Sequence, residues 1–140
     1  MKKFLPLFLA TAFIFAGTMV PSEAELVTVS GTLVDTRCYG MMPEANIGNT
    51  HKMMKGDKMV DAPKCATACA GMGIPAGIVE GGKAGNKTYV LITPTSQLKK
   101  HMAKQARVTG KIAYEGAIMP TKIEVKDDGK WKDVTPKAMM

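Results

Sequence analysis

The sequence predicts a single small domain of mainly β structure. With 140 residues the chain has room for one core of ordinary size, since domains cluster near about 100–150 residues. Its hydrophobic content of 46%, together with charges of both signs, excludes a disordered chain. Short segments of alternating apolar and polar residues recur between glycine-containing turns, and this pattern is typical of strands.

The first strand is expected at residues 26–34. Val27, Val29 and Leu33 lie on one face of this segment, while threonine and serine occupy the other face. Such alternation indicates a strand that is buried on one side. Gly31 lies in the middle of the strand and indicates a bend.

Residues 35–75 are expected to form an insertion after this strand. The part up to residue 63 is rich in methionine, is interrupted by glycine and proline, and has no sustained period. A long irregular segment in a compact domain is usually functional or disordered. Asp61 is expected to cap a short helix that runs to about Ala70 and ends at the glycines that follow.

The rest of the chain is expected to form further short strands and one helix. The glycine-rich residues 81–86 are expected to form the turn of a hairpin between strands at 76–80 and 88–93, and Pro94 ends the second strand. Leu98 and Met102 give the next segment the single apolar stripe of a surface helix. The expected strands lie at 76–80, 88–93, 108–114, 118–125 and 131–134, and the helix lies at about 95–105.

This order of elements resembles the OB-fold, a partly open five-stranded barrel. The resemblance covers residues 26–134 and rests on the single helix between the third and fourth of five strands. Gly31 and Gly110 lie in the middle of the first and fourth strands, where they fit barrel bends. The resemblance implies a small OB-like barrel whose Cys/Met-rich insertion, with its short helix, follows the first strand.

Residues 1–24 have the three-part pattern of a secretory signal peptide. Lys2 and Lys3 precede a largely apolar run at 4–20, and small residues lead to Ala24. We expect cleavage after Ala24, which places residues 25–140 in the periplasm or outside the cell as one domain without a membrane span. Nucleic acid is scarce there, so the formal charge of +7 favours solubility or an anionic envelope partner.

The chemically unusual residues lie together between positions 38 and 72. All three cysteines, Cys38, Cys65 and Cys69, fall here with His51 and six of the twelve methionines. Cys65 and Cys69 are four residues apart on the expected helix, so their side chains point to one face. With Cys38 and His51 they make a set of the number and type found in closed tetrahedral metal sites.

The metal expected at this set is Cu(I) or Zn(II). Thiolate and imidazole ligands suit zinc, and neighbouring thioethers suit a soft ion such as Cu(I). Met41, Met42, Met53 and Met54 are the candidate secondary or transfer ligands. The sequence therefore predicts an exported protein that binds a soft metal, in a handling or storage role.

Other cofactors and catalytic chemistry lack a pattern in this chain. There is no CxxCH sequence, so covalent heme attachment is not indicated. There is no phosphate-binding loop or dinucleotide fingerprint, so no nucleotide is expected. Nothing pairs two carboxylates or activates a serine, and we therefore expect that the protein is not an enzyme.

A disulfide is the alternative for the cysteines. In an oxidising compartment, a bridge from Cys38 to Cys65 or Cys69 would staple the insertion to the barrel and stabilise the fold by roughly 3–4 kcal/mol. One of the three thiols would remain unpaired, and an unpaired thiol in an exported protein favours binding to a ligand or a partner. A third interpretation is thiol–disulfide exchange by Cys65 and Cys69, although CxxxC lacks the CxxC spacing of redox thiols.

The disulfide alternative corresponds to a different function. The protein would then be a stapled interaction module that binds an envelope protein or an anionic polymer, as barrels of this kind often do across a strand face. The basic residues available for such a contact are Lys99, Lys100, Lys104, Arg107 and Lys111.

Overall fold

The structure, a computed structural model, describes residues 25–137 and is mainly β, as the sequence predicts. The expected signal peptide at residues 1–24 lies outside the described residues. In the part of the chain that the structure describes, no helix has the length and hydropathy needed to cross a membrane.

The strands and helices follow one another with a compact insertion after the first strand. The sheet contains β1 (Leu26–Asp35), β4 (Ala76–Glu80), β5 (Thr88–Leu91), β6 (Gln105–Tyr114), β7 (Ala117–Asp127) and β8 (Lys130–Asp133). The insertion contains α1 (Thr36–Met41), β2 (His51–Lys55), β3 (Lys58–Ala62) and α2 (Cys65–Gly71). A 3₁₀ helix, η1 (Thr95–His101), connects β5 to β6.

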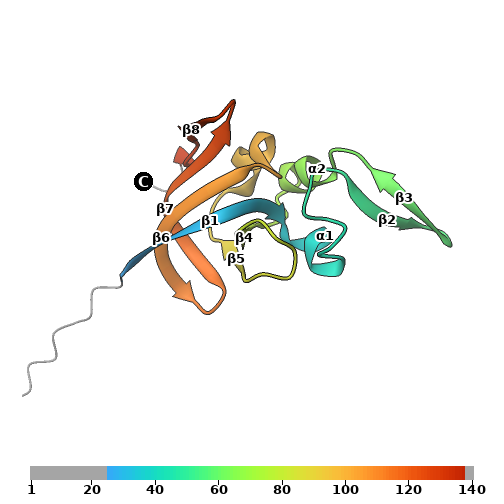
Figure 1. Ribbon diagram of the computed structural model, residues 1–140, viewed down its shortest axis with the longest axis horizontal. Helices are drawn as coiled ribbons and strands as arrows, with labels where there is room; N and C mark the ends of the chain where they lie inside the picture. The colour runs from blue at the N-terminus through green and yellow to red at the C-terminus, as the bar shows by residue number, and fades with distance from the viewer. Residues whose placement is uncertain (1–24, 138–140) are drawn as a thin grey trace, which may run out of the picture.

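The six strands of the sheet have the order β5-β4-β1-β6-β7-β8, and β5 also pairs with β7 in parallel. That last contact closes a ring of hydrogen-bonded strands, β1-β4-β5-β7-β6, while β8 pairs with the other end of β7. The hairpin β2-β3 stands apart from this sheet and projects beyond α2 (Figure 1). All six strand segments expected from the alternating pattern are present.

Two glycines allow neighbouring strands to approach closely. A Cβ on Gly31 would lie 1.9 Å from the carbonyl oxygen of Val79 in β4. A Cβ on Gly110 would lie 2.3 Å from the carbonyl oxygen of Met119 in β7, next to a shift in the β6–β7 register. Both positions therefore require glycine, because the neighbouring strand lies too close for any side chain.

Alternate residues of the strands fill the interior. Val29 and Leu33 of β1 are buried in the main core, where Val27 of the same parity packs against them. Leu98 of η1 and Met102, which follows it, belong to the same core. The apolar stripe predicted for that segment is therefore buried as expected.

The segment 95–105 forms a 3₁₀ helix that ends at His101 instead of the longer helix expected. Ala103 has a positive φ of 63°, and its N–H donates to the carbonyl of Leu33 at 2.8 Å. The N–H of Leu33 donates in turn to the carbonyl of Lys104 at 3.1 Å. Pairing with β1 therefore draws these residues into the sheet and ends the helix early.

The insertion is also more regular than the sequence predicts. Residues 51–62 form the hairpin β2-β3, which turns at Gly56 with a φ of 61°. Asp61 lies in β3, where it forms an ion pair with Lys52 at 2.6 Å, so the expectation that it caps a helix is wrong. The helix α2 begins at Cys65 after Lys64, whose φ is 57°. Most hairpin residues are exposed on both faces, so the strands carry no apolar alternation.

Candidate metal centre

The helices α1 and α2 bring the three cysteines together. Cys38 lies on α1, while Cys65 and Cys69 lie one turn apart on α2. Their Sγ atoms all lie within 4.8 Å of one another. Cys38 thus meets two cysteines that follow it by 27 and 31 positions in the sequence. We call this group the thiol cluster (Cys38, Cys65 and Cys69).

The end of β1 positions Cys38. Asp35 caps α1, because its Oδ1 accepts a hydrogen bond from the backbone N–H of Cys38 at 2.9 Å. The N–H of Thr36 donates to the carbonyl of Pro75 at 3.0 Å, which ties the start of α1 to the segment before β4. The side-chain amide of Asn46 donates to the carbonyl of Cys38 at 2.9 Å. The sheet therefore holds this cysteine through short connections.

The start of α2 positions the other two thiols. The N–H of Cys65 donates to the carbonyl of Asn49 at 2.8 Å, and the side-chain oxygen of Asn49 accepts from the N–H of Thr67 at 3.0 Å. Ala66 and Ala70 are fully buried in the main core. Because these alanines anchor one face of the helix, the cysteines at its other positions face α1.

The thiols have the spacing of ligands around one ion. The Sγ atom of Cys38 lies 3.9 Å from that of Cys65 and 4.0 Å from that of Cys69. With metal–sulfur bonds of about 2.3 Å, sulfurs around one ion lie about 3.8 Å apart in a tetrahedral site and about 4.0 Å apart in a planar one. Three sulfur ligands could therefore close on a metal with little movement.

The disulfide expected as the alternative is not formed. All three cysteines of the chain lie in the described part and are free. A bonded pair would have its sulfurs about 2.05 Å apart, well below the distances from Cys38 to its two neighbours. The physical reason is that α1 and α2 hold the Sγ atom of Cys38 at 3.9 and 4.0 Å from the other two sulfurs, beyond bonding distance.

The surroundings of Cys38 and Cys69 favour neutral thiols at these two residues while no cation is bound. Burial, together with the nearby carboxylate of Asp35, raises the pKa of Cys38 to about 12. Burial, followed by Asp35, likewise raises the pKa of Cys69 to about 11. A bound cation would offset both effects and displace the protons. A neutral thiol is a poor nucleophile, so the raised pKa of Cys69 disfavours its attack in thiol–disulfide exchange.

A pocket of about 380 Å³ lies over the thiol cluster. The Sδ atom of Met53 lies 3.9 Å from the Sγ atom of Cys65. The methionines that line the pocket are Met41, Met42, Met53, Met54 and Met72. We call it the methionine pocket. It contains all four candidate methionine ligands and a fifth, Met72, that sequence reasoning did not single out. Met41 and Met54 are 64% and 60% exposed, so the pocket opens to the surface.

His51 lies beside the thiol cluster but faces Asp35. Its side chain is fully buried, with Nε2 at 2.9 Å from the carbonyl oxygen of Gly48 and Nδ1 at 3.5 Å from Oδ2 of Asp35. Asp35, Cys38 and His51 have ligand atoms within 4.8 Å of one another. The four residues predicted to form one Cys₃His set therefore belong to two overlapping groups that share Cys38.

Sequence reasoning missed three residues that build this region. Asp35 precedes Cys38 by three positions, and an aspartate at that distance is a helix N-cap signal that could have identified it. Asn46 and Asn49 carry no such signal. Asn46 is fully buried and accepts a hydrogen bond from the N–H of Lys52 at 2.7 Å. These contacts depend on how the insertion folds back on itself.

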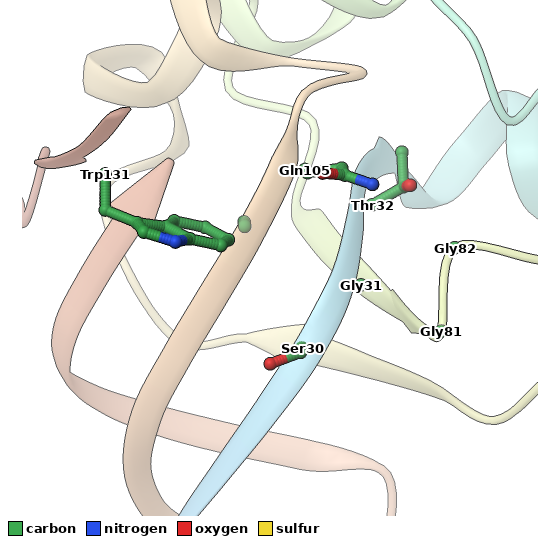
Figure 2. Close-up of a pocket in the computed structure, with 8 residues that line it drawn as sticks. Ser30, Gly31, Thr32, Gly81, Gly82, Gln105 and Trp131 are labelled. Atoms are coloured by element: carbon green, nitrogen blue, oxygen red, sulfur yellow. The ribbon is translucent and has the colours of Figure 1, made fainter. Parts of the chain in front are cut away.

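A second hollow, of about 200 Å³, lies on the sheet next to Trp131 (Figure 2). Its polar side chains are those of Ser30 and Thr32 in β1 and Gln105 in β6. It has no cysteine, histidine or carboxylate in its lining, and therefore offers none of the ligands that a soft metal prefers.

The basic residues considered for an anionic polymer are partly engaged within the fold. Lys104 forms an ion pair with Asp127 at 2.6 Å. Arg107 lies 3.6 Å from a carboxylate oxygen of Glu124, and its guanidinium stacks over the ring of Trp131 at 4.0 Å. These contacts reduce the charge available to an anionic partner.

Comparisons of the chain with known protein families, with curated proteins and with solved structures return no significant match.

Proposed function

We propose that this protein is an exported soft-metal-binding protein whose thiol cluster holds Cu(I). The observation that carries the proposal is the set of three free thiols from two helices, with Cys38 at 3.9 and 4.0 Å from the other two sulfurs. Those distances match the sulfur spacing around a single metal ion.

The chemistry of the ligands favours a soft ion. Thiolate and thioether sulfurs prefer Cu(I), whereas harder ions prefer oxygen. The Sδ atom of Met53 lies within 3.9 Å of a cluster sulfur, and four more methionines line the pocket above it. Zn(II) also binds thiolates, but thioethers are not among its usual protein ligands. The methionine pocket therefore makes copper the better match.

The exposure of the site suggests a handling role. Cys38 and Cys69 are buried, whereas Cys65 is partly exposed at the floor of the methionine pocket. A metal held there could be exchanged with a donor or acceptor through the thioethers, one ligand at a time. We propose that the protein passes metal to or from another periplasmic protein and does not act as an enzyme.

We also propose that the domain is an OB-like barrel and that the protein is located in the periplasm. The closed circuit β1-β4-β5-β7-β6, with η1 between β5 and β6, supports an OB-like barrel. The signal-peptide pattern at residues 1–24 supports export to the periplasm.

The test is a titration with Cu(I). Protein purified from the periplasm would be reduced, freed of metal and titrated anaerobically in competition with a chromophoric Cu(I) chelator. We expect one Cu(I) per chain, and an affinity lower by at least about 100-fold in Cys38→Ser, Cys65→Ser and Cys69→Ser.

Met119→Leu is the matched control, because Met119 is an exposed methionine of β7 outside the methionine pocket. It should bind Cu(I) like the unaltered protein. The proposal fails if the protein binds no Cu(I), or if the three cysteine variants bind it as tightly as the control does.

A further inference from the structure

A second group of ligand atoms lies directly against the thiol cluster. Asp35, Cys38 and His51 are all buried, and their ligand atoms lie within 4.8 Å of one another. The group combines carboxylate, thiolate and imidazole, which is the donor mixture that a borderline ion such as Zn²⁺ accepts. Cys38 belongs to both groups.

The hydrogen bond of His51 determines which ring nitrogen is available. Its Nε2 lies 2.9 Å from the carbonyl oxygen of Gly48. A carbonyl only accepts, so Nε2 carries the proton and donates it. In the neutral ring, Nδ1 then presents a lone pair on the side of Asp35. A backbone carbonyl bound to the far nitrogen is the usual support of a metal-ligating histidine.

The two atoms that face each other here have no hydrogen-bond partner among the described residues. They are Oδ2 of Asp35 and Nδ1 of His51, and both side chains have no exposed surface. Buried polar atoms are rarely left without a partner, because each one loses its hydration on folding. The other carboxylate oxygen of Asp35 is already used by the N–H of Cys38.

The distance between these atoms fits an ion between them. Oδ2 and Nδ1 are 3.5 Å apart, which is long for a charge-assisted hydrogen bond of about 2.7–2.9 Å. Two ligands with metal bonds of about 2.1 Å lie about 3.4 Å apart in a tetrahedral site. The observed separation is therefore close to one edge of a zinc tetrahedron.

We propose that Asp35, Cys38 and His51 bind a second, divalent cation of the Zn²⁺ class, with the Cys38 thiolate shared between this ion and the one in the thiol cluster. The proposal rests on the proposed function only for that sharing. The ligands of the second ion are otherwise separate from the two cysteines of α2.

The experiment uses Co²⁺ as a spectroscopic substitute for Zn²⁺. Reduced protein, once with one equivalent of Cu(I) added and once without Cu(I), would be titrated anaerobically with Co²⁺. Binding would be followed by visible absorption and by elemental analysis after gel filtration. Zn²⁺ would then be added to displace the Co²⁺. We expect one Co²⁺ in addition to the Cu(I), with a thiolate-to-cobalt charge-transfer band.

The variants separate the two sites. Asp35→Asn keeps the size of the side chain and an oxygen for the helix cap, and should weaken Co²⁺ binding by at least about tenfold while Cu(I) affinity is retained. His51→Gln should do the same. Cys65→Ser should lose Cu(I) affinity and still bind Co²⁺. Asp57→Asn makes the same chemical change as Asp35→Asn on an exposed hairpin residue, and should change neither.

Several results would overturn the proposal. They are the absence of a second ion, Co²⁺ binding that Asp35→Asn leaves unchanged, and a loss of Cu(I) in His51→Gln equal to that in Cys65→Ser. That last result would make His51 the fourth ligand of a single metal. If Co²⁺ binds and depends on Asp35 while Cu(I) does not bind, the proposed function fails and the second site stands. Circular dichroism would check that each variant folds. If His51→Gln does not fold, Asp35→Asn alone is enough to test the second site.

Discussion

Metal binding at the thiol cluster should release protons and therefore become tighter as the pH rises. The pKa values of Cys38 and Cys69 are raised to about 12 and about 11, so both thiols are protonated near neutral pH. The metal binds thiolates and must displace those protons. Each released proton makes the affinity about tenfold higher per pH unit, or about 1.4 kcal/mol. With two protons, Cu(I) affinity should rise at least about 100-fold per pH unit between about pH 6 and pH 8.

The assay is calorimetric titration of Cu(I) in buffers of different ionisation enthalpy, because the dependence of the heat on the buffer counts the protons released. Chelator competition at each pH, corrected for protonation of the chelator, gives the affinity. Cys38→Ser should release about one proton fewer than the unaltered protein. Release of less than one proton near pH 7, or an affinity independent of pH, would refute the assignment of these thiols as ligands.

Three further predictions concern stability and are measured by chemical denaturation of the metal-free, reduced protein. Because the pKa values of Cys38 and Cys69 are raised in the folded state, the free energy of unfolding should fall as the pH rises from about 9 toward 11 and 12, whereas these two thiols add no pH dependence between about 7 and 8. A constant value above about pH 9 would contradict the burial of these thiols. Gly31→Ala should destabilise the fold by about 2–4 kcal/mol, because the new Cβ meets the Val79 carbonyl oxygen at 1.9 Å; a change below about 0.5 kcal/mol would show that the strands separate easily. Leu33→Ala should cost about 2–5 kcal/mol at a fully buried position, and a smaller loss would indicate that the core collapses around the cavity.

The strands of the six-stranded sheet were predictable because each of them carries its own signal in the sequence. Val27, Val29 and Leu33 alternate along β1, and this side faces the core. The hairpin β2-β3 was not predictable in the same way. Apart from His51 and Ala62, its residues are exposed on both faces, so no burial imposes an alternating pattern on the sequence. The end of η1 was missed for a different reason, since the sheet contacts of Leu33 decide it.

The candidate site was predictable in its composition but only in part in its geometry. The concentration of sulfur between positions 38 and 72 is visible in the sequence alone. The expectation that Cys65 and Cys69 lie on one helix is also correct. The choice between a disulfide and three separate thiols was not visible, because it depends on the approach of α1 to α2.

The sequence by itself determined the local features of this protein: the alternating strands, the glycines at the close approaches and the ligand types gathered in one insertion. Only the tertiary structure decided which of those ligands meet. Cys38 comes within 4.0 Å of Cys69 across 31 residues, and His51 faces Asp35 instead of the thiols of α2. The physical reason is that periodicity reports the burial of a residue relative to its near neighbours, whereas a site assembled from distant segments depends on how the folded sheet anchors their ends.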